Sequence, residues 1–176
     1  MKKIFGLITL LFVSVCSYAQ TELTPNGLKF SNGDDYMVIE CEGKSQTELY
    51  NAVNDFLTIN YVSPKDVVSS SGTNIISCNG VTDIYLNRIA QGRMNYTMVF
   101  RFKDGRIRID LPHINSLYTD GVDYELVRSS WLSTAYIFQK NGKLYAEDSK
   151  ADIENFFNRF ISKLQKHISN SSSENW

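Results

Sequence analysis

Apolar and polar residues alternate most regularly between residues 94 and 111, and this alternation predicts a β-hairpin. Its turn is expected at Asp104-Gly105, because Asp-Gly is typical of a two-residue turn that needs positive φ at both positions. The turn fixes the register of the two strands. The expected pairs are Phe100 with Ile109, Arg101 with Arg108, Phe102 with Ile107, and Lys103 with Arg106. All the apolar side chains then share one face of the hairpin, and all the cations share the other.

Two further segments place apolar residues at helical spacing. The first helix is expected to begin at Ser45, since Ser45 and Glu48 form the Ser-x-x-Glu pattern of a capping box. It ends before Pro64, because the residue before a proline avoids the α region. The second helix is expected to be capped by Asp148 or Ser149. The apolar faces comprise Leu49, Ala52, Val53, Phe56 and Leu57 in the first helix, and Ile153, Phe156, Phe157, Phe160, Ile161, Leu164 and Ile168 in the second.

Shorter alternating segments complete the predicted sheet. Strands are expected at residues 36–42, 66–70, 74–78 and 122–127. Residues 79–93 contain Gly80 and Gly92 and are expected to form a loop or a partial strand. Residues 131–140 fit either a strand or a short helix, so the Asn141-Gly142 dipeptide fits either a hairpin turn or a helix C-cap. These elements predict an α+β fold in which an antiparallel sheet carries two helices on one face, in the order β-α-β4-α.

The N-terminal residues have the three parts of a secretory signal peptide. Met1-Lys2-Lys3 is positive, residues 4–15 are apolar, and Ser17-Tyr18-Ala19 places small residues where a signal peptidase reads. We expect cleavage after Ala19, which makes residues 1–19 the signal peptide, since the apolar stretch is short for a retained anchor. A lipid anchor at Cys16 is not expected, because Val15 stands where a lipoprotein signal needs a small residue. The predicted location is the periplasm or cell envelope, with secretion as the alternative.

Removal of nineteen residues from 176 leaves about 157, enough for one domain with its own core. We divide this part into a lead-in arm at residues 20–34, a single α+β domain at 35–169, and a polar disordered tail at 170–176. No transmembrane segment is expected after signal removal. The chain has 18 Lys and Arg residues and 19 Asp and Glu residues, and without Lys2 and Lys3 its net charge becomes −3. This balance gives no support to nucleic acid as a partner.

Two cysteines follow the signal, Cys41 and Cys78, and they are a candidate disulfide in an oxidising compartment. They can pair only if their strands are neighbours. The alternative is two free thiols, each buried as a small apolar residue.

No catalytic signature stands out in the sequence. His113 and His167 could each act as a general base, but a loop position and a helix end explain them as well. No histidine or cysteine spacing matches a metal site and no glycine-rich phosphate loop is present, so we expect no metal and no cofactor. Glu40 and Glu42 could serve in glycoside hydrolysis, although a solvated strand face accounts for both. Enzymatic activity is left open, with a non-enzymatic role favoured.

The order strand, helix, several strands and helix, with the Ser45-x-x-Glu48 helix start and the aromatic strand leading into Lys103-Asp104-Gly105-Arg106, resembles the DUF4468 family. These are exported proteins, mostly of Bacteroidetes, with a domain of unknown function described as having a TBP-like fold. The resemblance is best across residues 36–112. It implies a fold and a compartment, and it implies no activity. TATA-box binding uses two such repeats with intercalating phenylalanines, whereas this chain has one repeat and an acidic balance, so DNA binding is not implied.

The four cations of the hairpin, Arg101, Lys103, Arg106 and Arg108, are named here the basic patch. Like charges that face each other across two strands are destabilising, so something should neutralise them. Glu40 or Glu42 could do so from a neighbouring strand, and a bound anionic partner is the functional alternative. Our leading hypothesis is a non-enzymatic binding or interaction domain of the cell envelope, whose partner is an unknown protein or an anionic envelope component. The alternatives are a secreted enzyme inhibitor and a hydrolase that uses scattered carboxylates.

Overall fold

The computed structural model describes residues 21–61, 63, 67–86, 90–119 and 121–170. The predicted signal peptide at residues 1–19 and the lipid-anchor question at Cys16 lie outside these residues. The predicted tail at 170–176 also lies outside them, apart from Asn170, which ends the last helix. No helix of the described part is both long enough and apolar enough to cross a membrane.

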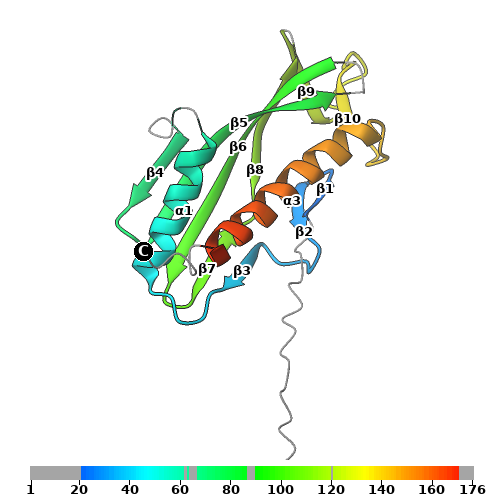
Figure 1. The fold of residues 1–176 in the computed structure, drawn as a ribbon. Helices are drawn as coiled ribbons and strands as arrows, with labels where there is room; N and C mark the ends of the chain where they lie inside the picture. Colours follow the sequence, from blue (N-terminus) through cyan, green and yellow to red (C-terminus); the bar gives the residue numbers. More distant parts are fainter. Residues whose placement is uncertain (1–20, 62, 64–66, 87–89, 120, 171–176) are drawn as a thin grey trace, which may run out of the picture.

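Two helices and a large sheet make up most of the fold (Figure 1). The helices are α1 (Gln46–Asn60) and α3 (Glu147–Asn170). The main sheet contains β3 (Tyr36–Glu40), β4 (Val68–Ser71), β5 (Ile75–Leu86), β6 (Ala90–Lys103), β7 (Arg106–Asp110), β8 (His113–Thr119), β9 (Val122–Val127) and β10 (Tyr136–Phe138). A separate two-stranded sheet consists of β1 (Thr21–Thr24) and β2 (Gly27–Phe30).

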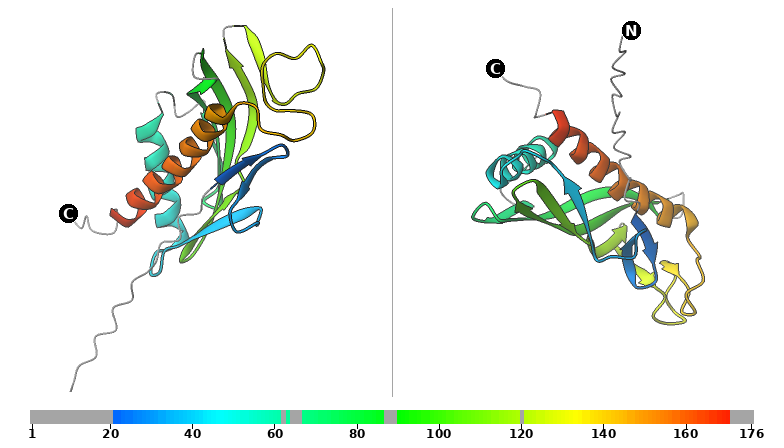
Figure 2. Two further views of the ribbon diagram at one scale, coloured as in Figure 1. Left: turned by 90° about the vertical axis from the view of Figure 1, so that its right-hand side faces the viewer. Right: turned by 90° about the horizontal axis from the view of Figure 1, so that it is seen from below.

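The main sheet has eight strands, with β10-β9-β8-β6-β5-β4 in one row and β7 lying between β6 and β3. Its neighbouring strands are antiparallel except β9 and β10, which are parallel. Both helices lie on the same side of this sheet, as the two views in Figure 2 show. The α+β class and the two helices on one face are therefore confirmed. The sheet has more strands between the helices than the four expected.

The β6–β7 hairpin has the predicted register in all four pairs. Gly105 has a φ of 76°, the left-handed conformation that this turn requires. The four apolar residues of the hairpin are buried on the helix side, and the four cations are exposed on the opposite side. Strand β3 extends the hairpin, because it pairs with β7 and buries Met37 and Ile39 on the same side. The agreement between turn chemistry and alternation was therefore sufficient to predict this region.

Strands β5 and β6 are longer than predicted, and the described part of residues 79–93 is strand instead of loop. The two strands stay paired as far as Leu86. Gly80 and Gly92 lie within these strands and give room to neighbouring side chains. A Cβ on Gly80 would approach Tyr96 Cε1 at 2.9 Å, and a Cβ on Gly92 would approach Leu86 Cγ at 2.9 Å. Of the two alternatives left open, a loop or a partial strand, the loop is wrong, because these glycines permit close packing within a paired strand.

The starts of the two helices differ in how well they were predicted. Helix α1 has the expected capping box between Ser45 and Glu48, and the hydrogen bonds from Ser45 lower the pKa of the Glu48 carboxyl. Helix α3 begins at Glu147, so Asp148 and Ser149 lie in its first turn and do not cap it, contrary to expectation. The predicted apolar faces are buried, except that Phe156 of α3 is only half-buried.

The segment predicted as a lead-in arm contains the β1–β2 hairpin, which packs on α3. Its Leu23 and Phe30 are buried in the core. The backbone amides of Thr21 and Leu23 donate to side chains of α3, to Asn158 Oδ1 at 2.8 Å and to Glu154 Oε1 at 2.7 Å. The arm therefore contributes to the folded core.

The region between Pro112 and α3 forms β8, β9 and β10, and the predicted strand at 122–127 is confirmed. Of residues 131–140, only the three of β10 are strand. Asn141-Gly142 forms a hairpin turn, because the Gln139 amide donates to the Lys143 carbonyl at 2.8 Å and Gly142 has a φ of 81°. This geometry excludes the alternative of a helix C-cap at Asn141-Gly142.

Cys41 and Cys78 are both free thiols. Cys41 follows β3 and Cys78 lies in β5. Strands β7 and β6 lie between β3 and β5 in the sheet. Three interstrand spacings of about 4.8 Å put these two strands roughly 14 Å apart, and the cysteines are also offset along them, whereas a disulfide needs Cα atoms within about 7 Å. The candidate disulfide is therefore wrong for this structure. Cys78 is fully buried and Cys41 is half-buried, and burial raises the pKa of both thiols.

Candidate functional site

The helices leave one face of the sheet open (Figure 2), and the register and burial of β6 and β7 place the basic patch on that face. Arg101 and Lys103 project from β6, and Arg106 and Arg108 project from β7, because alternation in paired strands sends all four to one side. The side chains of Arg101 and Arg108 are 47% and 45% exposed. The patch is therefore accessible to a partner in solution.

Asp110 neutralises two of the four cations. Arg101 Nε donates to Asp110 Oδ2 at 2.8 Å, and Arg108 Nε donates to Asp110 Oδ1 at 2.6 Å. The Asp110 side chain is 21% exposed, so these ion pairs are partly shielded from water. Glu40 or Glu42 was expected to neutralise the cations, but the residue that pairs with Arg101 and Arg108 is Asp110. Asp110 stands two residues after Arg108 in the same strand and therefore shares its face. Glu40 lies opposite Arg106 in the register of β3 and β7.

The two remaining cations, Lys103 and Arg106, form no ion pair within the described residues, and they border a hollow of ≈ 400 Å³. Tyr36 and Val38 of β3 also line this hollow and are 40% and 39% exposed. The guanidinium carbon of Arg108 lies 4.2 Å from the centroid of the Tyr36 ring, which is cation–π geometry. The hollow therefore combines unpaired positive charge with aromatic and aliphatic surface.

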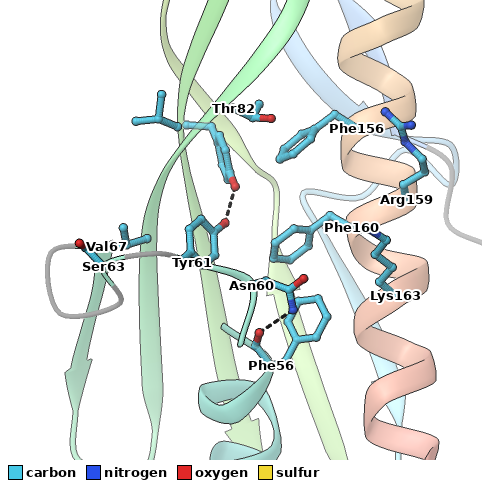
Figure 3. A pocket seen from close by; sticks show the side chains of 12 residues that line it. Phe56, Asn60, Tyr61, Ser63, Val67, Thr82, Phe156, Arg159, Phe160 and Lys163 are labelled. Atoms are coloured by element: carbon cyan, nitrogen blue, oxygen red, sulfur yellow. Dashed lines mark hydrogen bonds between the residues drawn. The ribbon is translucent and has the colours of Figure 1, made fainter. Parts of the chain in front are cut away.

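A second hollow, of ≈ 620 Å³, lies where α1 ends beside the middle of α3 (Figure 3). Its apolar lining comes from α1 and the residue after it, from α3 and from β6, and consists chiefly of Phe56, Tyr61, Tyr96, Phe156 and Phe160. Figure 3 shows Phe156 and Phe160 pointing from α3 toward Tyr61, and the Tyr96 ring contacts Phe156. Phe156 is half-buried and not core because it faces this hollow. We name it the interhelix hollow.

Two phenols close the inner end of the interhelix hollow. The hydroxyls of Tyr61 and Tyr96 are hydrogen-bonded to each other, as the dashed line in Figure 3 shows. Burial raises the pKa of both hydroxyls, so both are neutral at ordinary pH. The Tyr96 ring meets Phe156 edge to face with centroids 5.0 Å apart. The polar atoms at this end therefore satisfy each other, and the surface beside them is apolar.

The loop between β9 and β10 presents two exposed apolar side chains, Trp131 at 81% and Leu132 at 67% exposure. The Glu125 carboxylate accepts from the amide and the hydroxyl of Ser129, both at 2.7 Å, and these bonds lower the Glu125 pKa. Arg128 donates to the carbonyl of Trp131 at 2.6 Å. The loop is thus held by its own hydrogen bonds while its apolar tip faces water.

The residues considered for catalysis are not brought into a hollow. His113 is exposed at the start of β8, and His167 lies against the Phe56 ring with centroids 5.6 Å apart. Neither hollow described above has a carboxylate among the described residues of its lining. Among the described residues, no group of three or more histidines, cysteines, aspartates and glutamates is arranged to hold a metal ion.

Sequence reasoning identified the basic patch but missed the residues that complete it. Alternation along β7 already places Asp110 beside Arg108, so that residue could have been found. Tyr36 and Val38 needed the pairing of β3 with β7, which the local pattern does not reveal. Tyr61 lies after the end of α1 and carries no periodic signal of its own.

Comparison with known proteins supports the fold. The family model described as "Domain of unknown function (DUF4468) with TBP-like fold" matches residues 36–116, which confirms the resemblance. A TBP-like protein from Parabacteroides distasonis ATCC 8503 is 20% identical with a TM-score of 0.52, over 74% of this chain and 90% of that one. A DUF4468 family protein from Bacteroides ovatus ATCC 8483 is 14% identical with a TM-score of 0.45, over 74% and 84%. No curated protein matches the chain. The first of these structures shows a shared TBP-like fold.

Proposed function

We propose that this chain, whose residues 36–116 match the DUF4468 family, is an exported binding domain of the cell envelope that holds an anionic partner on the open face of its sheet. The observation that carries the proposal is the hollow of ≈ 400 Å³ at the basic patch. The signal pattern of residues 1–19 supports export. The partner is an acidic protein segment or an anionic envelope polymer, because the patch offers several cations in a row.

The arrangement of the patch favours binding in two ways. Lys103 and Arg106 have no ion pair to give up within the described residues, so an incoming anion gains their charge without competition. Arg101 and Arg108 are already oriented by Asp110, and preorganised side chains lose less entropy on binding. A guanidinium also matches the geometry of carboxylate and phosphate groups.

The test is binding of two labelled probes, a deca-glutamate peptide and an oligogalacturonate, to the chain without residues 1–19. Lys103→Gln with Arg106→Gln should weaken binding by about tenfold or more, because hydrogen bonds to charged groups contribute about 1.5–3 kcal/mol. The matched control is Lys143→Gln with Lys166→Gln, which removes the same charge from exposed positions elsewhere. Equal weakening by both variants would show that only net charge matters, and this would refute a localised site.

A second function, enzyme inhibition, is favoured by the β9–β10 loop. Tryptophan is enriched at binding hot spots, and a loop held by internal hydrogen bonds loses little entropy when it inserts into a cleft. The test is inhibition of purified secreted proteases and glycosidases by the chain. Inhibition that Trp131→Ala abolishes, and that Lys103→Gln with Arg106→Gln leaves unchanged, would support this function over the first.

A further inference from the structure

We infer that the interhelix hollow is a second binding site, which takes a single-chain amphiphile with an anionic head group. The site lies on the helix side of the sheet, opposite the basic patch, so it is independent of the function proposed above. Its volume of ≈ 620 Å³ lies within the range of about 300–1,000 Å³ that is usual for ligand pockets.

The charge of the lining selects an anion. Among the described residues of the lining, the charged ones are both cations, Arg159 and Lys163, and they stand one helical turn apart on α3. Arg159 Nε donates to the Asn155 carbonyl, which leaves its other nitrogens for a ligand, and Lys163 forms no ion pair within the described residues. Figure 3 shows both cations on the helix that also supplies Phe156 and Phe160. A carboxylate or phosphate head would therefore lie beside α3.

The interior of the hollow selects an apolar body. Phe156 precedes Arg159 by three residues and Lys163 by seven, so the cations and the aromatic rings share one face of α3. The hydroxyls of Tyr61 and Tyr96 are hydrogen-bonded to each other and neutral, so this end of the hollow presents no charge to a ligand. Val67 adds aliphatic surface at the far side. An alkyl chain would replace water along these rings, and each buried methylene should raise affinity about fourfold.

The experiment compares three dodecyl probes below their micelle concentrations by isothermal titration calorimetry. Dodecanoate should bind, and dodecanol and dodecyltrimethylammonium should bind at least about tenfold more weakly, because they lack the anion. Decanoate should bind roughly fifteenfold more weakly than dodecanoate, because it lacks two methylenes. Dodecyl phosphate and vesicles of phosphatidylglycerol distinguish the source: binding of the free amphiphile alone supports a soluble ligand, and binding of the vesicles supports a lipid in a membrane.

Two variants locate the site. Arg159→Gln with Lys163→Gln should remove the preference for dodecanoate over dodecanol, and Thr82→Phe should weaken all dodecyl probes by filling the hollow. Lys166→Gln, on the same helix but outside the lining, and Lys103→Gln with Arg106→Gln on the opposite face are the matched controls and should change nothing. Equal affinity for the three head groups, or unchanged binding in Thr82→Phe with a native circular dichroism spectrum, would overturn the inference.

Discussion

Replacing Gly80 by alanine tests whether the long β5–β6 pair depends on close packing. A Cβ at this position would approach Tyr96 Cε1 at 2.9 Å and would lie still closer to its Cζ and hydroxyl. Tyr96 is 1% exposed and is enclosed by Phe156 and Phe157, so its ring has little room to move. We therefore expect Gly80→Ala to destabilise the fold, although an alanine normally suits a strand better than a glycine.

The expected magnitude follows from three contributions. Overpacking of a buried site costs about 1–3 kcal/mol. Displacement of the Tyr96 hydroxyl would also weaken its hydrogen bond to Tyr61, which costs about 1 kcal/mol. The gain from replacing a strand glycine is about 0.5–1 kcal/mol. The net loss is about 2 kcal/mol, which lowers the urea midpoint by roughly 1 M for an m-value of about 2 kcal/mol/M.

The assay is urea unfolding followed by far-ultraviolet circular dichroism, with a double-mutant cycle that includes Tyr96→Leu. Leucine lacks the ring atoms that the new Cβ would meet, so Gly80→Ala in that background should stabilise by about 0.5–1 kcal/mol. The sign of the effect therefore reverses between the two backgrounds. An equal loss in both would show that the Tyr96 ring is not the cause and would refute the packing argument.

Three further predictions follow from the helix cap, the cysteines and the N-terminus. Ser45→Ala should destabilise the chain by about 1 kcal/mol in thermal unfolding. Because folding lowers the pKa of the Glu48 carboxyl, its ionised form stabilises the fold at pH values above its usual pKa of 4.5, and this stabilisation is lost as the pH falls through the lowered pKa. The destabilisation by Ser45→Ala should therefore become smaller on acidification. Thiol titration of the chain without residues 1–19, denatured and unreduced, should find two reactive groups; in the native state Cys41 should react before the fully buried Cys78, and a blocked pair would contradict the sheet order. Mass spectrometry of the exported protein should find Gln20 as the first residue, and a chain that starts at Met1 or at a lipidated Cys16 would contradict cleavage after Ala19.

Features that depend on residues close together in the chain could be predicted from the amino-acid sequence. The Asp104-Gly105 turn and the alternation around it act over a few residues, and they were enough to predict the register and the two faces of the hairpin. The same holds for the capping box at Ser45 and for the apolar faces of both helices. Such signals are reliable because each one involves its own backbone and its near neighbours.

The tertiary structure alone decided the features that depend on contacts between distant segments. Gly80 makes room for Tyr96 of β6 and does not end the strand. A glycine in the sequence is compatible with either outcome, so only the packing against β6 distinguishes them. The separation of Cys41 from Cys78 follows from the order of strands, which no local pattern encodes. The interhelix hollow exists because the end of α1 and the middle of α3 leave a space above β6, and helical spacing specifies which residues share a face but not what that face meets.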